Sequence, residues 1–235
     1  MAFGFTQVAS PGSGAGTTYT LAVPASAAGA LLVLGISYAS NNRSISSVSD
    51  NVDGAWTLGV KGAVSGTGIG AYYKANATAS ARTITVVFDA STVTGVFLAC
   101  TEYSGLLTTA AFDVNSPIAA IASGTSVTTA SITTTQDTEL LWSFGRSEGI
   151  NRPLTTPTGY TSRVALDTTR FVLADNRQTV AGGETVTWAV TGGNSAIGAM
   201  LLTFKETVTA TGRLFLPFGL DGLGGGGSLK FNPTL

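Results

Sequence analysis

The sequence predicts an all-β fold: an antiparallel jelly-roll-like β-sandwich built from two similar halves, with an extended C-terminal arm. Three observations lead to this prediction. Thr, Val, Ile and aromatic residues alternate with small polar residues in short segments that Gly, Ser, Asn, Asp and Pro separate, as strands and turns do. No segment of helix length has a 3.6-residue hydrophobic period. The order of segments in the first half of the chain also recurs in the second half.

The predicted strands are of two kinds. In residues 184–190, Val186 and Trp188 fall on one face and Thr185 and Thr187 on the other, because side chains alternate along a strand. Four other segments are almost continuously apolar, as in strands that are covered on both faces or lie centrally in a sandwich. These segments are 31–36, 96–100, 140–144 and 199–202.

The internal repeat consists of matching segments in the same order. Residues 17–23 and 30–35 match 126–132 and 139–145, residues 70–75 and 82–88 match 171–175 and 184–188, and 95–99 match 198–202. One half would leave an apolar face unburied, so we expect the halves to pack face to face into one sandwich of eight to ten strands.

These matches divide the chain. They predict a sandwich over residues 1–206, with half-repeats at about 17–105 and 126–206, and an arm over 207–235. Residues 106–125 are expected to form a linker. The Pro-containing stretch 145–160 is expected to form a long exposed loop, a place where binding residues often lie.

The arm contains two apolar segments on either side of a Gly224–Ser228 hinge, and four consecutive glycines have almost no preferred conformation. Apolar segments around such a hinge predict an arm that docks on its own or a neighbouring subunit. A frayed terminus or an engineered spacer is the alternative. The predicted partner-binding residues are the large apolar ones, Leu214, Phe215, Leu216, Phe218, Leu220, Leu223, Leu229, Phe231 and Leu235.

The charge content is low. Asp, Glu, Lys and Arg make up 11% of the chain and the net charge is −1, whereas about 25% of an average domain is charged. Such a surface favours association with other protein; the alternative is an exposed β-domain that is merely rich in Thr. The basic residues are not clustered, which argues against nucleic acid. No apolar run approaches the ~20 residues of a membrane span, and the N-terminus does not resemble a secretory signal.

Few residues could carry out catalysis. The chain has no histidine, which excludes Ser-His-Asp triads, Cys-His dyads and HExxH zinc sites. The single Cys100 lies in an apolar run and is expected to be buried. The enzymatic alternative that stays open is a glycosidase with two carboxylates. We therefore predict a protein that is not an enzyme, with no catalytic residues, cofactor or metal.

Two other patterns resemble binding sites. Asp50–Gly54 has some of the oxygen ligands of a calcium loop, but its Asp-Gly also fits a hairpin turn, which we favour. Exposed aromatic side chains could stack on sugars. Trp142 and Trp188 are expected in the core, and Tyr160, beside the loop 145–160, is the better surface candidate.

Several segments together suggest a family. These are Ser47–Asn51, Gly54–Thr57, Ala71–Lys74, Thr83–Val86 and Thr101–Gly105. This pattern resembles β-sandwich proteins that tailed phages and prophages encode in their structural modules, and it covers about residues 17–206. The resemblance implies a component of the virus particle and carries no catalytic residues.

We therefore expect a capsid decoration (cement) protein, located in the virion and made in the host cytoplasm. Its expected partners are other virion proteins, chiefly the major capsid protein, and further copies of itself, for example in a trimer. The alternative is a carbohydrate- or receptor-binding sandwich of a tail fibre or secreted protein. That protein would bind through the loop Arg146–Tyr160 and through Tyr72 or Tyr73.

Overall fold

The computed structural model describes residues 3–10, 13–39, 43–89 and 93–208, and all the regular secondary structure of these residues is β-strand. Every named pair of strands is antiparallel, as in β1 with β10 or β15 with β21. The all-β, antiparallel prediction is confirmed. The predicted partner-binding residues of the arm, from Leu214 to Leu235, lie outside the described residues.

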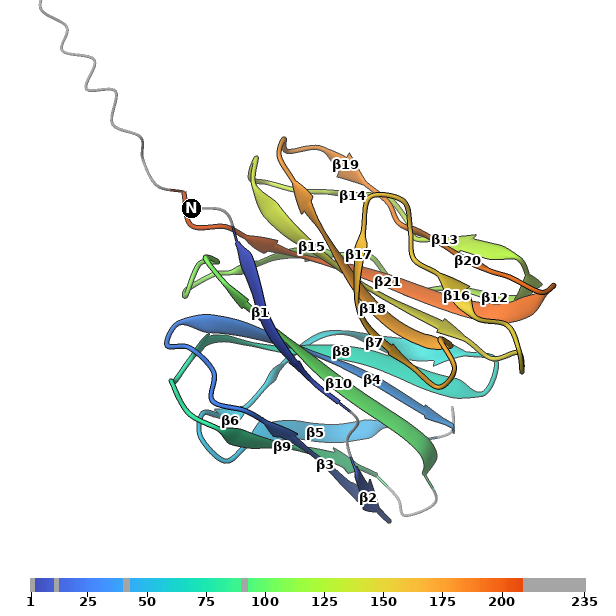
Figure 1. The fold of residues 1–235 in the computed structure, drawn as a ribbon, viewed down its shortest axis with the longest axis horizontal. Helices are drawn as coiled ribbons and strands as arrows, with labels where there is room; N and C mark the ends of the chain where they lie inside the picture. Colours follow the sequence, from blue (N-terminus) through green and yellow to red (C-terminus); the bar gives the residue numbers. More distant parts are fainter. Residues whose placement is uncertain (1–2, 11–12, 40–42, 90–92, 209–235) are drawn as a thin grey trace, which may run out of the picture.

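The first half of the chain forms two five-stranded sheets (Figure 1). The first central sheet has the order β1 (Gly4–Ala9), β10 (Thr94–Ser104), β4 (Ala30–Ala39), β8 (Thr67–Ala77) and β7 (Thr57–Val64). The first outer sheet has the order β2 (Ser13–Ala15), β3 (Thr18–Val23), β9 (Arg82–Phe88), β5 (Ile45–Asp50) and β6 (Gly54–Ala55).

The second half repeats this plan. Its central sheet has the order β11 (Phe112–Asn115), β21 (Ser195–Lys205), β15 (Glu139–Ser147), β18 (Phe171–Gln178) and β17 (Thr161–Leu166), and β12 (Ala119–Gly124) also pairs with β21. Its outer layer consists of two small sheets. One has the order β13 (Ser126–Thr128), β20 (Thr187–Val190) and β16 (Leu154–Thr155), and the other pairs β14 (Ile132–Thr133) with β19 (Gly183–Glu184).

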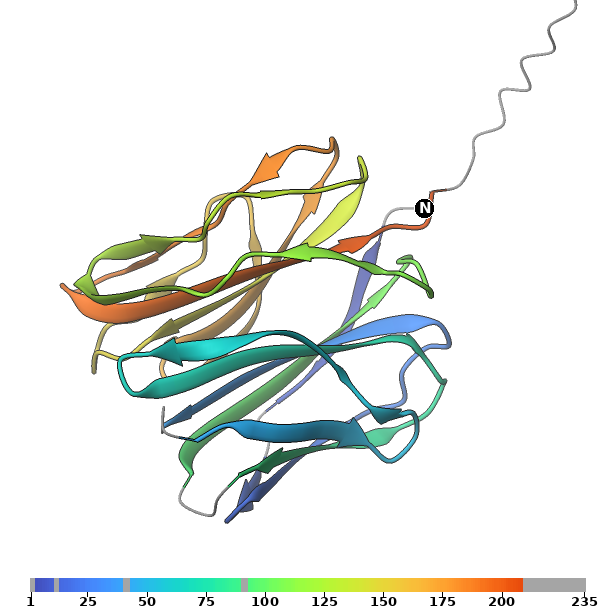
Figure 2. The same ribbon diagram turned by 180° about the vertical axis from the view of Figure 1, so that it is seen from behind.

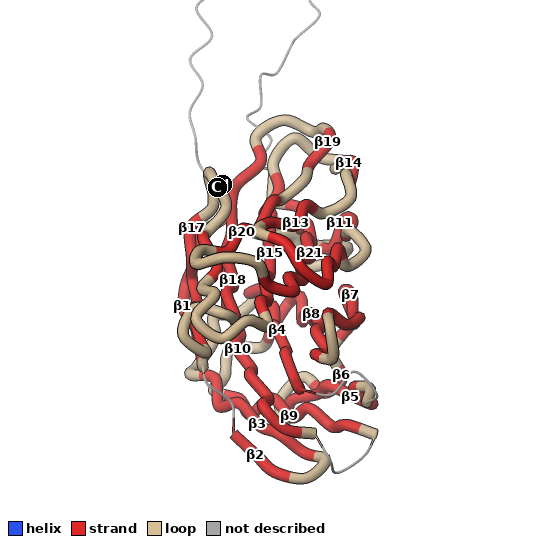
Figure 3. Tube along the Cα trace, turned by 90° about the vertical axis from the view of Figure 1, so that its right-hand side faces the viewer, coloured by secondary structure: helices blue, strands red, loops and turns tan. Residues whose placement is uncertain are grey.

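The four layers are stacked in the order outer, central, central, outer (Figure 3). Three apolar cores lie between them. One fills the first half and includes Leu34 and Ile84, and another fills the second half around Trp188. The third lies between the two central sheets and includes Val33 and Phe144. The central strands β4, β10, β15 and β21 are therefore covered on both faces, which explains their continuous apolar sequences.

The layering differs from the expected single sandwich, because each half already contains two sheets with a core of its own. In each half, the strands of alternating polar and apolar residues have one face exposed to solvent. The continuously apolar strands have both faces buried. The apolar face that one half leaves uncovered is that of its central sheet. The two central sheets cover each other there, and the β7–β8 hairpin also lies against β21 and β12 (Figure 2).

The registers pair corresponding strands in both halves, although β21 is shifted by two residues from the match of 95–99 with 198–202. Leu31 lies opposite Tyr103 in the first central sheet, and Leu140 lies opposite Phe204 in the second. The expected linker 106–125 is wrong in part, because β11 and β12 form there and pair with β21 as β1 pairs with β10. Pro117 lies between these two short strands. It has no backbone N–H to donate to β21, so it interrupts the edge of the second central sheet.

Candidate functional site

The segment Asp50–Gly54, considered above as a calcium loop, is a turn held by protein donors. Asp50 Oδ1 accepts hydrogen bonds from the backbone N–H groups of Val52 and Asp53, both at 2.7 Å. Its other oxygen accepts the indole N–H of Trp56 at 2.7 Å. Within the described ranges, no group of three or more His, Cys, Asp or Glu residues is arranged to hold a metal.

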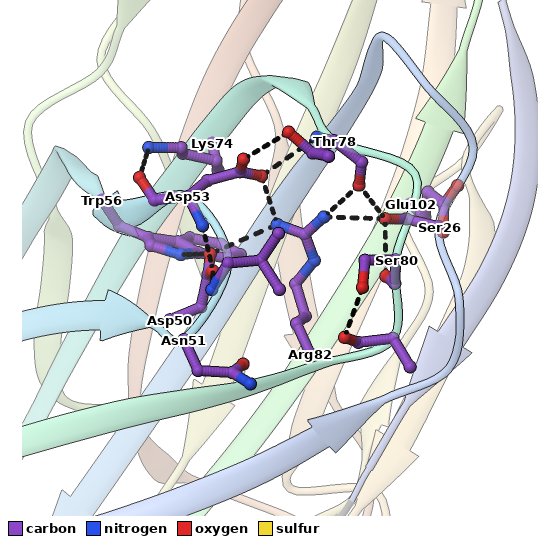
Figure 4. A network of polar contacts seen from close by, with 12 residues as sticks. Ser26, Asp50, Asn51, Asp53, Trp56, Lys74, Thr78, Ser80, Arg82 and Glu102 are labelled. Atoms are coloured by element: carbon purple, nitrogen blue, oxygen red, sulfur yellow. Dashed lines mark hydrogen bonds and ion pairs between the residues drawn. The ribbon is translucent and has the colours of Figure 1, made fainter.

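Arg82 links this turn to the rest of the first half (Figure 4). Its guanidinium is buried and lies 2.6 Å from a carboxylate oxygen of Asp53 and 3.3 Å from one of Asp50. It also donates to Ser26 Oγ at 2.9 Å and to the carbonyl of Thr78 at 2.5 Å. Burial raises the pKa of Asp53, but hydrogen bonds from Thr78 and Arg82 outweigh it and lower this pKa to about 2. This network of Arg82 with Asp50, Asp53, Ser26 and Thr78 holds the turn in place, and we call it the turn clamp.

The second half pairs its charges in the same way. Arg163 binds Asp175, Arg177 binds Glu206, and Asp167 accepts from both Arg146 and Arg170. These contacts range from 2.5 to 2.7 Å. Many of the few charged residues therefore form ion pairs within the chain, between strands and turns.

Two neighbouring carboxyl groups, Asp113 and Glu139, bear on the glycosidase alternative. Glu139 is fully buried, and Asp113 binds Lys205 at 2.9 Å and the Thr135 hydroxyl at 2.6 Å. Burial, together with the hydrogen bond and charge of Asp113, raises the pKa of Glu139 to about 7. A glycosidase needs two acids that flank a bound sugar, whereas Glu139 is closed off from solvent.

The aromatic side chains that could contact sugars are mostly in the cores. Trp142 and Trp188 are fully buried, as predicted, and Trp56 and Tyr72 are buried as well. The ring of Tyr73 is stacked on that of Phe112. Tyr160, the expected surface candidate, is only half-exposed: it packs against the core around Trp188, and its hydroxyl oxygen is buried.

Tyr160 borders a groove of about 440 Å³ in the second outer layer. The groove lies between β20 and the turn Pro157–Tyr160, in which the Tyr160 N–H donates to the Pro157 carbonyl at 3.0 Å and Gly159 has a φ of 83°. No charged residue lines the groove. Its walls are Thr155, Thr156, Pro157, Thr158, Tyr160, Thr185, Val186, Thr187 and Ala189.

The outward faces of the two outer layers share one composition. Alternate residues of β3, β9 and β5 point outward in the first outer sheet, and none is charged; they are Thr18, Thr20, Ala22, Thr83, Thr85, Val87, Ser47 and Ser49. The second outer layer presents Ser126, Thr128, Thr155, Thr185, Thr187 and Ala189. We call these two surfaces the hydroxyl faces. They lie at opposite ends of the four-layer stack (Figure 3).

Cys100 is a buried free cysteine, as expected, and burial raises the pKa of its thiol. The stretch 145–160 is only partly a loop, since it includes the end of β15 and all of β16. Among the described residues, no helix has the length and hydropathy to span a membrane. The groove at Tyr160 was missed by sequence reasoning, because β16 and β20 meet only in the fold.

Comparison with known proteins gives no relative. No protein-family model matches the chain, no curated protein is similar to it in sequence, and no solved structure matches its fold. Its function must therefore be argued from its own residues.

Proposed function

We propose that this chain is a structural protein of a virus particle, a non-catalytic decoration protein that binds neighbouring subunits through its hydroxyl faces and its C-terminal arm. The observation that carries this proposal is the composition of the hydroxyl faces. A surface with few charges favours association with other protein, and the outward residues of both faces are uncharged Thr, Ser, Ala and Val.

The size of a face explains why an arm would be needed. Three strands about 4.8 Å apart and six residues long, at about 3.3 Å per residue, cover roughly 300 Å². Stable interfaces bury about 800 Å² on each partner. A hydroxyl face alone falls short of that area, and the apolar residues of the arm, Leu214 to Leu235, would supply the remainder.

The strand order supports a jelly-roll origin for each half. In the first half, β1, β10, β4 and β8 alternate in the chain with β3, β9, β5 and β6 of the opposite sheet. Eight-stranded jelly rolls consist of two four-stranded sheets that exchange strands in this manner, and they recur in viral capsid and lectin domains. The assignment to a virion also draws on the sequence resemblance, and fold alone does not imply function.

The test is the position of the chain in particles made by the virus or prophage that encodes it. We expect gradient-purified particles to contain the chain in a fixed ratio to the major capsid protein, with density on the outer capsid by cryo-electron microscopy. Replacing Leu214, Phe215 and Phe218 with serine should strip the protein from the capsid and leave its thermal unfolding unchanged. Particles that lack the chain, or carry it only at the tail tip, would refute the proposal.

A further inference from the structure

The two outer layers can be compared residue by residue, because β9 matches the segment that contains β19 and β20. Arg82 lies opposite Val23, and Glu184 lies opposite Ile132, which is the residue that the repeat matches to Val23. Counting onward along both segments, Thr83 corresponds to Thr185 and Thr85 to Thr187.

The aromatic residues Trp56 and Tyr160 also correspond. Each directly precedes the edge strand of its central sheet, β7 or β17. The first residues of these strands, Thr57 and Thr161, lie opposite Tyr73 and Asp175. These two lie in turn opposite Val33 and Trp142, which match each other in the repeat. The surroundings of the two aromatic residues can therefore be compared directly.

In the first half, a strand fills the space between β9 and Trp56. β5 runs along β9 until Asp50 lies opposite Ile84, with Ser49 opposite Thr85. Beyond it, Asn51 Oδ1 accepts the backbone N–H of Thr83 at 2.7 Å. Asp50 also accepts the indole N–H of Trp56.

In the second half, this strand is absent. β16 pairs with Val190 and Ala189 only, and the chain then turns away at Pro157–Tyr160. Within the described residues, no side chain accepts the backbone N–H of Thr185 as Asn51 accepts that of Thr83. The buried hydroxyl of Tyr160 has no hydrogen-bond partner there either. The groove lies where residues 48–50 would lie in the first half.

The missing strand would be three residues, or about 10 Å, long. The groove of about 440 Å³ lies in its place. An open strand position of this kind is a template for pairing with another extended segment.

We propose that residues Leu229–Asn232 of a second copy of this chain fill the groove and pair with β20 as the strand that the second half lacks. This inference rests on the proposed function in one respect, that the arm docks on a neighbour. The segment alternates in strand fashion, with Leu229 and Phe231 on one face and Lys230 and Asn232 on the other. Gly224–Ser228 precede it and Pro233 follows it, so pairing would be confined to these few residues.

The register follows from the first half. Leu229 takes the place of Val48, Lys230 that of Ser49 and Phe231 that of Asp50, so Lys230 lies opposite Thr187 with both side chains outward. Reach is sufficient, since residues 209–228 span up to roughly 66 Å at about 3.3 Å per residue. A folded body of about 200 residues is roughly 43 Å across.

A cysteine pair tests this register in the full chain. Cα atoms of directly opposed residues on neighbouring strands are about 4.5–5.5 Å apart, within the range that a disulfide spans. We expect T187C combined with K230C to form disulfide-linked oligomers under mild oxidation. Mixing the two single variants should give the same linkage between chains. The native Cys100 is buried and does not compete.

The repeat provides matched controls. T85C with K230C should stay unlinked, because β5 occupies that position, and S49C with T85C should form the bond within one chain. Amide exchange gives a second measurement. In the unmodified chain, the Thr185 and Thr187 amides should exchange at least 10-fold more slowly than in the variant carrying L229S and F231S.

Three outcomes would overturn the inference. They are equal linkage through Thr187 and Thr85, linkage only within single chains, and amide protection that appears only when a neutral oligosaccharide such as maltotriose is added. If capsid binding is retained in any of these cases, the inference fails while the proposed function stands. If the T187C–K230C linkage forms but the chain is absent from particles, the proposed function fails and the strand exchange stands.

Discussion

The indole ring of Trp188 lies against the backbone of Gly145, where no side chain intervenes. A Cβ atom on Gly145 would be 2.5 Å from Cδ2 of the indole and 2.7 Å from Cε3. The repeat places Ile36 and Val86 at the corresponding positions of the first half, and both are fully buried. In the first half, the larger residue of the pair, Ile36, lies on the central strand and Val86 lies on the outer strand. In the second half, the central strand has glycine and the outer strand has the large tryptophan. Cores tolerate such exchanges when total volume is kept.

Gly145→Ala should lower the free energy of unfolding by about 1–3 kcal/mol, because a rigid buried indole cannot move aside for the methyl group. Urea unfolding at pH 7 measures this. Gly182→Ala is the control, since no atom lies within 4 Å of its added Cβ, and it should leave stability unchanged or raise it by up to about 1 kcal/mol. Equal effects of the two substitutions would contradict this account.

The sequence allowed the strands and the repeat to be predicted but not the number of layers. Strand periodicity follows from local residues, and the segments 31–36 and 140–144 correctly indicated strands covered on both faces. Which sheet covers each face depends on long-range pairing. The prediction of one sandwich assumed that each half contributes a single sheet, whereas β9 and β20 belong to outer layers of their own.

The groove at Tyr160 depends on such pairing as well. In the sequence, four residues, 157–160, stand where the first half has the longer stretch 49–56. That difference within the repeat was the one signal that could have indicated a missing strand. This difference in length can be recognised only from the strand register, because the correspondence of Trp56 and Tyr160 requires β7 and β17 to be aligned.

The two halves are joined by hydrogen bonds that are buried between the central sheets. The indole N–H of Trp142 donates to Thr101 Oγ1 at 3.0 Å, and the Tyr103 hydroxyl donates to Asp175 at 2.8 Å. Thr101→Val keeps the shape but leaves the indole N–H unpaired, so it should cost about 1–3 kcal/mol. Thr101→Ser keeps the hydroxyl and should retain more of the stability than Thr101→Val. Thermal unfolding of both variants tests this, and a Val variant as stable as the Ser variant would refute it.

Arg82 is the centre of the turn clamp in the first half. Arg82→Met removes the cation from Asp50 and Asp53 and leaves both carboxylates without their ion pair, which should cost about 3–5 kcal/mol in urea unfolding. Arg152→Met is the control, because among the described residues the Arg152 guanidinium donates only to backbone carbonyls of exposed loops. Its expected cost is below about 1 kcal/mol. If the two variants lose the same stability, the clamp is not what holds the turn.

Glu139 should make the protein less stable as the pH rises. Its pKa is about 7 in the folded chain and 4.5 in the unfolded reference, so the folded state binds the proton more tightly. The stabilisation is complete below pH 4.5 and is lost between pH 4.5 and 7, an effect of roughly 3 kcal/mol. Glu139→Gln stays neutral beside Asp113 and should be more stable than the original protein by that amount at pH 8, with little difference at pH 4.5. A Glu139→Gln profile parallel to that of the original protein would show that Glu139 is ionised in the folded state at neutral pH.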